Sequence, residues 1–404
     1  MIIGVIGGGA SGMAAALAAA EAPDTRVVLM ERQARLGRKL RATGNGRCNL
    51  TNLHAGGAGY HGEKPLFWQY ALEKFPPEET LEWFRRMGLY TVAEPSGRVY
   101  PYSDQANSVA DILRFALDRA NITVKAGFEA EKIRKSSAGF RVESREESLD
   151  FDRLIVACGG LAGTALGGSM SGYKLLRALG HHSTRLRPNL VQLCANWGAL
   201  PSLKGVRANC EASIFRDGAR YAESRGELQF TQYGLSGPVI FEVSRDVCQG
   251  GGEWICRLDF LPDLDRKVLT EELLRRRGTD LPASELFTGI LHNRLGRVLT
   301  GEAGISQQGA IRDIPDGAIC LAAEKAKALD ITLTQPMGMD AAQVTAGGIR
   351  TEEFDEKTLE SALVPGLYAC GEVLDVDGDC GGYNLQWAWS SGRLAGISAG
   401  RSNR

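Results

Sequence analysis

Three glycines and a glutamate near the start of this 404-residue chain have the types and spacing that bind a dinucleotide. Gly7, Gly9 and Gly12 follow the apolar run IIGVI in the pattern G-x-G-x-x-G and begin an alanine-rich segment. The first glycine permits a tight turn, the second lets backbone approach a pyrophosphate, and the third lets a helix pack on a strand. Glu31 ends the next apolar run, where it would accept hydrogen bonds from an adenosine ribose. The residues predicted to contact the dinucleotide here are Gly7, Gly9, Ala10, Ser11, Gly12 and Glu31.

A strongly basic segment at 32–47 directly follows Glu31 and carries six cations. Next to the residue that is expected to bind the ribose, these cations would offset the two negative charges of the pyrophosphate. The residues 43–46 suit a loop pressed against a flat ring, because glycine allows close backbone approach. A solvated basic loop and a nucleic-acid patch are the alternative interpretations, although the net charge of -1 gives the chain no overall attraction to polyanions. The residues assigned to the cofactor are Arg32, Lys39, Thr43, Gly44, Asn45, Arg47, Cys48 and Asn49.

A glycine pair near the C-terminus provides a third candidate, in GGYNLQWAW at 381–389. Gly381 and Gly382 would let the N-terminus of a helix approach a ring. Reduced flavin carries negative charge near N1 and its C2 oxygen, which free helix N–H groups stabilise. The alternative is an ordinary core helix that begins at a glycine. The remaining residues assigned to the cofactor are Ala130, Ala157, Gly159, Gly371, Glu372, Asp375, Gly382, Tyr383, Asn384 and Leu385.

The composition argues against several other kinds of site. Nine cysteines, none in CxxC spacing, argue against a disulfide scaffold, a zinc site and a dithiol redox pair. The five histidines have no metal-like spacing, so no metal is predicted. No Lys or Arg precedes the apolar N-terminal run and glycines interrupt it, so we do not expect a signal peptide. The sequence contains no run of 18 uncharged apolar residues, so we predict no membrane span. We expect a cytoplasmic protein.

The scaffold that positions these motifs is predicted from the apolar patterns. The runs 2–6 and 26–31 are expected to be strands joined by a helix to about residue 22, which is a βαβ unit. A helix is expected at 106–120, followed by a small antiparallel meander and the buried run LIVACGG. The fold class is therefore α/β, with a discontinuous Rossmann-type FAD-binding domain at 1–189 and 337–404. An inserted domain occupies 190–336, β-rich over 190–262 and helical over 263–325.

Longer segments resemble the BaiN-like flavoproteins, a bacterial family of NAD(P)/FAD-dependent oxidoreductases. The resemblance covers essentially the whole chain and implies an FAD domain, an inserted β-barrel-like domain and a small helical part. This sequence departs from the family at Gln232, where His is frequent, and at Cys158, where Thr is usual. The segments are RLGRKLRATGNGRCNLTN at 35–52, GRVYPYSDQA at 97–106, ACGG at 157–160, GELQFTQYGLSGP at 226–238, TAGGI at 345–349 and GEVLDVDGDCGGYNLQWAWSSGRLAG at 371–396.

The resemblance implies NAD(P)H-driven reduction of a C=C bond conjugated to a ketone, in 3-oxo-bile-acid or steroid-like enones. FAD supplies the hydride chemistry, and a proton donor must reach the α carbon. Tyr383 and Tyr233 are candidate donors, and Arg47 is a candidate carbonyl anchor. No second G-x-G-x-x-G lies between a strand and a helix, so NAD(P)H is expected to dock transiently.

Two alternative functions remain at this point. The first is a flavin oxidase of a small amine such as aminoacetone, and the second is an FAD-containing binding protein that acts on RNA. The partner expected first is a small-molecule substrate, without nucleic acid or membrane, and the sequence leaves the oligomeric state open.

Overall fold

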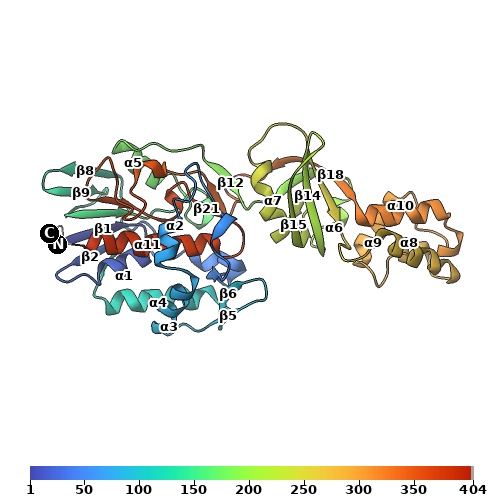
Figure 1. Ribbon diagram of the computed structural model, residues 1–404, viewed down its shortest axis with the longest axis horizontal. Coiled ribbons are helices and arrows are strands. Elements are labelled where there is room, and N and C mark those ends of the chain that lie inside the picture. The colour runs from blue at the N-terminus through green and yellow to red at the C-terminus, as the bar shows by residue number, and fades with distance from the viewer. Residues whose placement is uncertain (402–404) are drawn as a thin grey trace. The chain divides into compact units, whose positions relative to one another are not determined.

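The chain divides into two compact units in the computed structural model, which describes residues 1–401 (Figure 1). Unit 1 comprises Met1–Arg187 and the chain from Gln343 onward, and unit 2 comprises Pro188–Ala342. The first part of the chain and its last part therefore fold together, with unit 2 inserted between them.

The boundaries differ slightly from the predicted ones. Residues 337–342, which were predicted to lie in the FAD-binding domain, belong to unit 2. The reason is two contacts of Met337: its backbone N donates to Gln192 O at 2.9 Å, and its sulfur lies 3.4 Å from Cys194 Sγ. Residues 188–189 belong to unit 2 as well.

Unit 1 is organised around one parallel sheet. Its strands run in the order β20-β11-β1-β2-β7, and each neighbouring pair is parallel. The runs predicted at 2–6 and 26–31 form adjacent strands, because continuous apolar runs suit strands covered on both faces. The helix between them, α1, spans Ala10–Ala19 and ends before the predicted residue 22, at a turn that leads to Pro23. The strands are β1 (Ile2–Ile6), β2 (Arg26–Glu31), β7 (Thr123–Ala126), β11 (Arg153–Val156) and β20 (Leu367–Ala369).

Smaller elements complete unit 1. The predicted helix at 106–120 is α4 (Ala106–Arg119), and the predicted meander is the antiparallel sheet β10-β9-β8. A further antiparallel sheet, in the order β3-β6-β5, was not predicted. The bounds are β3 (Thr51–Asn52), β4 (Tyr60–His61), β5 (Thr91–Ala93), β6 (Arg98–Pro101), β8 (Lys132–Ser136), β9 (Gly139–Glu143), β10 (Ser148–Phe151), β19 (Val344–Ala346), β21 (Asp377–Gly378), α2 (Gln69–Lys74), α3 (Pro77–Arg86), α5 (Ser171–Ala178) and α11 (Tyr383–Gly400).

Unit 2 contains a closed barrel in the order β13-β16-β15-β14-β17-β18. The hairpin between β14 and β15 turns at Asp217 and Gly218, with φ values of 50° and 84°, as the predicted turn requires. The β-rich stretch also holds a helix that was not predicted, α7 (Pro238–Val247). The strands are β13 (Leu193–Asn196), β14 (Arg207–Arg216), β15 (Ala219–Phe230), β16 (Gly234–Ser236), β17 (Trp254–Asp259) and β18 (Leu329–Pro336).

Three helices form the predicted helical part of unit 2. They are α8 (Arg266–Arg275), α9 (Asn293–Glu302) and α10 (Asp316–Lys327). Their apolar residues join those of the barrel in one buried cluster that includes Leu269, Leu295 and Ile319. The apolar side chains of this region are therefore part of the core of unit 2.

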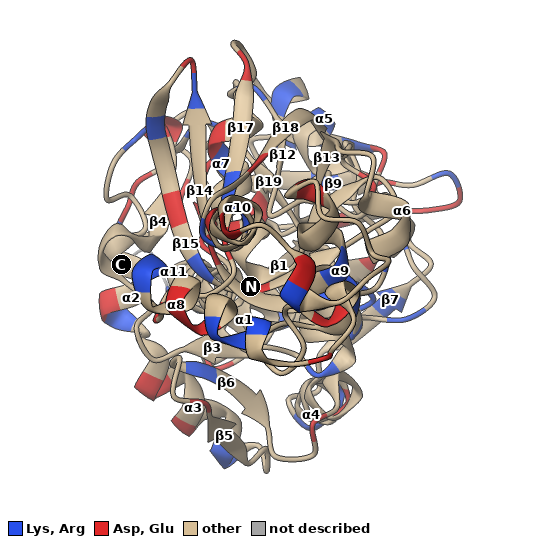
Figure 2. Ribbon diagram, turned by 90° about the vertical axis from the view of Figure 1, so that its right-hand side faces the viewer, with Lys and Arg blue, Asp and Glu red and all other residues tan. Residues whose placement is uncertain are grey.

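Charge is mixed along the described chain. Figure 2 shows positive and negative residues interspersed on the helices and strands, consistent with 47 Lys and Arg against 48 Asp and Glu in the sequence. Within residues 1–401 no helix is both long and apolar enough to cross a bilayer.

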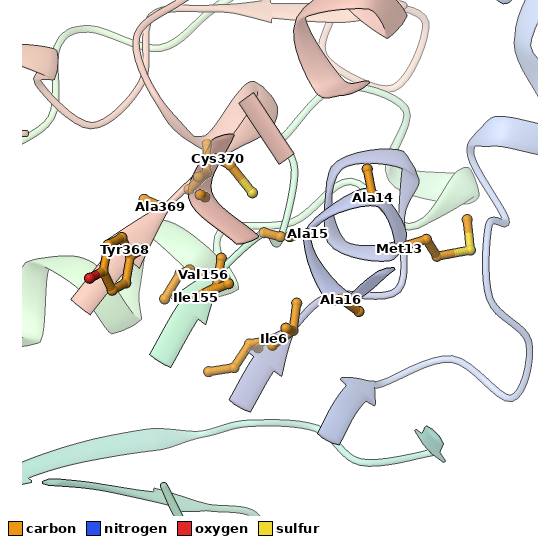
Figure 3. Packing of buried hydrophobic residues seen from close by; sticks show 14 of the residues in the cluster. Ile6, Met13, Ala14, Ala15, Ala16, Ile155, Val156, Tyr368, Ala369 and Cys370 are labelled. Atoms are coloured by element: carbon orange, nitrogen blue, oxygen red, sulfur yellow. The ribbon is translucent and has the colours of Figure 1, made fainter. Parts of the chain in front are cut away.

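Helices α1 and α11 pack with their backbones close together. A Cβ on Gly392 would overlap the carbonyl oxygen of Ser11, and one on Gly396 would overlap that of Ala15. Since α1 is made almost entirely of small residues, it is buried on nearly every side. Figure 3 shows Ala15 and Ala16 of α1 near Ile6 of the central sheet. Glycine at these positions therefore fixes how closely α11 approaches the first βαβ unit.

We expect G396A to lower the stability of unit 1 by about 1–3 kcal/mol, because the added methyl group must push the two helices apart. Urea unfolding followed by tryptophan fluorescence measures this. The matched control is G317A in α10, where the new methyl group meets no atom within 4 Å. Equal unfolding midpoints for G396A and the parent would contradict the role of close packing.

Candidate functional site

The turn after β1 is closed on one side and open on the other. A Cβ on Gly7 would overlap the carbonyl oxygen of Ala157, and a Cβ on Gly12 would overlap that of Gly7. A Cβ on Gly9 would meet nothing within 4 Å, and the same holds for Gly159, which has a φ of 69°. Gly7 therefore packs against Ala157, the residue after β11, and Gly12 packs against Gly7, while the side of the turn at Gly9 stays open.

The N-terminus of α1 has unpaired donors. The helix has no side-chain cap and no acidic residue in its first turn. Met13 N donates to Gly9 O at 3.0 Å, but among the described residues nothing accepts from the N–H groups of Ala10, Ser11 or Gly12. Such N–H groups and the positive end of the helix dipole bind phosphate. A diphosphate therefore fits this end of α1.

Glu31 is held in a fixed orientation at the end of β2. Its Oε2 accepts from Gly8 N at 2.6 Å, and its Oε1 accepts from Gln33 N at 2.7 Å. Phe128 N donates to Glu31 O, so the loop after β7 that holds the buried Ala130 runs beside it. Each carboxylate oxygen retains acceptor capacity for a ribose hydroxyl.

The cations of the segment 32–47 are largely used within the protein. Five of the six cations have protein partners, and three of the five, Lys39, Arg41 and Arg47, form ion pairs with carboxylates. The pairs are Arg32 with Gly167 O (2.5 Å), Arg38 with Gln33 (3.0 Å), Lys39 with Glu372 (2.8 Å), Arg41 with Asn107 (2.7 Å) and Arg47 with Asp104 (2.5 Å). The segment thus gives a bound pyrophosphate less positive charge than its composition predicts.

The loop that follows Leu40 has an unusual backbone. Thr43 O accepts from Cys48 N at 2.9 Å, which closes the loop. Burial raises the pKa of the Cys48 thiol to about 12, so this thiol stays protonated and serves packing. Asn49 Oδ1 is buried and has no hydrogen-bond partner in the part of the chain that the structure describes. The left-handed residues are Gly44 (φ 57°), Asn45 (φ 56°), Gly46 (φ 86°) and Cys48 (φ 62°).

Left-handed backbone at a residue such as Cys48 is uncommon and concentrates at ligand-binding loops. Together with the unpaired Asn49 acceptor, it supports the predicted role of this loop as a wall of the cofactor site.

The N-terminus of α11 is fixed by the β3 strand. A Cβ on Gly382 would overlap the backbone of Thr51, and Asn52 Nδ2 donates to Gly381 O at 2.9 Å. Gln386 N is the first to bond within the helix, to Gly382 O at 3.0 Å. The backbone N–H groups of Asn384 and Leu385 have no partner among residues 1–401.

The side chain of Asn384 is occupied. Its Oδ1 accepts from Gly378 N at 2.8 Å, and its Nδ2 donates to Gly378 O at 2.7 Å. The prediction that Asn384 contacts the cofactor can therefore hold only for its backbone.

The segment 371–375 connects the two helix N-termini. A Cβ on Gly371 would lie 2.5 Å from Ser11 Oγ, and Trp387 Nε1 donates to Gly371 O at 3.1 Å. Glu372 accepts from Thr345 N at 2.9 Å as well as from Lys39. Asp375 is 3% exposed and accepts from Glu63 N at 3.0 Å. Both predicted acidic residues thus have protein partners.

The predicted catalytic residues are divided between the two units, with Tyr383 and Arg47 in unit 1 and Tyr233 in unit 2. The Tyr383 hydroxyl donates to His54 O at 3.3 Å. Tyr233 belongs to unit 2 and is 66% exposed. Arg47 bonds to Asp104 and lies 3.4 Å from Glu94, so its charge is already compensated. The role predicted for Arg47 as a carbonyl anchor is therefore weakened.

Two residues of β6 were missed. Tyr100 is 7% exposed, and within the described residues its hydroxyl forms no hydrogen bond. Arg98 is half-buried and lies against Gly381. Both lie in GRVYPYSDQA, one of the segments that carry the family resemblance, and this is the sequence signal that points to them.

Comparison with known proteins identifies the family. The family described as HI0933-like protein Rossmann domain matches residues 1–398. The chain belongs to this family. The resemblance to BaiN-like flavoproteins is thereby confirmed, and the protein is an FAD-dependent oxidoreductase with a Rossmann-type FAD-binding domain.

Three curated relatives cover nearly the whole chain. The 3-dehydro-bile acid delta(4,6)-reductase of Clostridium scindens is 40% identical over 405 residues, with 98% of each chain covered. The ribosomal RNA dihydrouridine synthase of Escherichia coli is 31% identical and covers 96% of this chain and 95% of its own. The ribosomal RNA dihydrouridine synthase of Haemophilus influenzae is 27% identical, with 98% of each chain covered.

The residues of this family member fit FAD. The open turn at Gly9 and the unpaired N–H groups of α1 suit the diphosphate, and the oriented Glu31 carboxylate suits the ribose. The buried Asn49 acceptor and the uncapped N-terminus of α11 suit the polar edge of the flavin ring. No group of His, Cys, Asp or Glu that would hold a metal occurs among the described residues.

We expect E31Q to weaken FAD binding by about 10- to 100-fold, because it replaces charge-assisted hydrogen bonds to a ribose with neutral ones. Titrating the apoprotein with FAD and following flavin fluorescence measures the Kd. E147Q is the control, since Glu147 is paired with Lys125 on the surface. An unchanged Kd for E31Q would remove Glu31 from the site.

Proposed function

We propose that this protein uses NAD(P)H to reduce a carbon–carbon double bond conjugated to a carbonyl, in an enone of the bile-acid or steroid class. The observation that carries the proposal is the 40% identity, over 98% of both chains, to a 3-dehydro-bile acid delta(4,6)-reductase. The aligned region therefore includes both the FAD-binding unit and the inserted unit.

When bound, FAD supplies a hydride acceptor and donor at N5. The chain's own residues bind and orient it: Glu31 holds the ribose, and the N–H groups of α1 hold the diphosphate. The N–H groups of Asn384 and Leu385 stabilise the negative charge that accumulates on reduction. A tyrosine hydroxyl supplies the proton to the substrate α carbon.

The proton donor is Tyr383, which lies in the first turn of α11 beside these N–H groups. Tyr100 is the alternative, because its hydroxyl has no hydrogen-bond partner up to Arg401 and burial raises its pKa. A raised pKa keeps a phenol protonated at neutral pH, as a donor must be.

A second candidate function is supported by the two relatives named ribosomal RNA dihydrouridine synthase. The 5,6 double bond of uracil is conjugated to the C4 carbonyl, so its reduction is the same chemistry on a different substrate. The intramolecular pairing of the cations at 32–47 and the mixed charge in Figure 2 favour the small-molecule substrate.

The substrate proposal predicts a two-stage result in anaerobic stopped-flow. Excess NADH or NADPH should bleach the visible flavin absorbance, and a 3-oxo-4-ene steroid should then restore it. The matched control is the same 3-ketosteroid without the double bond, which should leave the flavin reduced. Flavin that stays oxidised under excess of both nicotinamides contradicts the proposal.

Two further measurements distinguish the enone reductase from the two alternative functions. Addition of two hydrogens to a uridine of ribosomal RNA, detected by mass spectrometry after digestion, supports the RNA substrate. Steady release of peroxide with a small amine and no nicotinamide supports the oxidase.

We expect Y383F to slow reoxidation of the reduced enzyme by the enone by about 100-fold or more, because the substrate α carbon loses its proton donor. Reduction of the flavin by NAD(P)H should keep the parent's rate, since that step needs no such donor. Stopped-flow of each half-reaction separates the two rates. If Y100F shows this pattern and Y383F does not, Tyr100 is the donor.

A further inference from the structure

One face of β6 contacts both parts of the expected flavin site. Arg98 and Tyr100 are two residues apart, so their side chains lie on the same face of the strand. Tyr100 lies 3.4 Å from the point where a Cβ on Gly44 would stand. The Arg98 Nε lies 2.7 Å from the corresponding point on Gly381. The strand therefore joins the loop after Leu40 to the start of α11.

The position of Arg98 at α11 is specified by its neighbours. Asn52, which pairs with Arg98 across the β3–β6 ladder, also holds Gly381 O through its Nδ2. Gly381 has a φ of 108° and no side chain, which lets the guanidinium reach the first turn of the helix. The Cβ of any other residue at position 381 would occupy the space in which the Arg98 side chain lies.

Arg98 is also unpaired. In the described chain its side chain forms no hydrogen bond and no ion pair, although it is half-buried. By contrast, Arg47, which the sequence favoured, bonds to Asp104 and lies near Glu94. A half-buried arginine without a carboxylate keeps its full charge for another anion.

We propose that Arg98, together with the N-terminus of α11, stabilises the negative charge that the flavin ring acquires when N5 is reduced or bonds to sulfite. Two positive sources then act on the same charge, the guanidinium and the helix dipole. This role rests on the FAD site and is independent of which substrate the enzyme reduces.

Sulfite provides a test that needs no substrate. Its sulfur lone pair bonds to N5 of oxidised flavin without any oxidant or reductant, and the adduct carries the added negative charge on the ring. We expect R98M to raise the sulfite Kd about tenfold or more, and R98K to raise it less. The loss of visible flavin absorbance gives the Kd, and the midpoint potential should become more negative in R98M.

The control variant is R86M, because Arg86 is 71% exposed and pairs with Glu82 on α3. It should retain the parent's sulfite Kd. A parental Kd in FAD-loaded R98M would overturn the proposal, and so would a defect confined to the substrate KM.

A second pair of variants covers the case in which R98M fails to retain FAD. G381A should displace the guanidinium and weaken sulfite binding as R98M does. G180A imposes a similar backbone cost, with a φ of 98°, but its added methyl group meets nothing within 4 Å. Parental sulfite affinity in G381A, or an equal loss in G180A, would contradict a role for Arg98.

Discussion

The close approach of the α1 and α11 backbones is the constraint on which the cofactor site depends. Helix α1 begins at the diphosphate turn, and α11 begins at the expected flavin ring, so one helix pair sets the distance between two halves of the site. Glycines 392 and 396 make this approach possible, because each faces a carbonyl oxygen of α1 directly. The site is thus positioned by backbone packing, which side-chain motion disturbs little.

The electrostatics of the site are simpler than the composition implies. Most cations of the basic segment hold parts of unit 1 together, as Lys39 does with Glu372 and Arg47 with Asp104. Among the groups described at the site, two helix N-termini and Arg98 carry positive charge that no protein group compensates, and the two helix N-termini are fixed by backbone packing. Preorganised donors of this kind stabilise a developing charge without reorganisation when it appears.

Local features of this site were predictable from the sequence, and long-range ones were not. The first βαβ unit, the glycine roles and Glu31 follow from residues within thirty positions of one another. The pairing of Lys39 with Glu372 spans 333 positions, and no pattern in a single sequence encodes it. Arg98 lies in the resembling segment GRVYPYSDQA, but its place next to Gly381 is a long-range contact that the segment alone does not predict. The misplaced boundary at 337–342 reflects contacts to Gln192 and Cys194, which are equally remote.

The insertion of unit 2 has a consequence for synthesis of the protein. All six barrel strands lie between Leu193 and Pro336, so the barrel has its full sequence while the ribosome is still adding the rest. The parallel sheet lacks β20 and the first helix lacks its glycine-bearing partner until the final stretch emerges. The nascent chain therefore holds the complete sequence of the barrel while the alanine-rich helix α1 still lacks α11, and the cofactor site is complete only after α11 has been made.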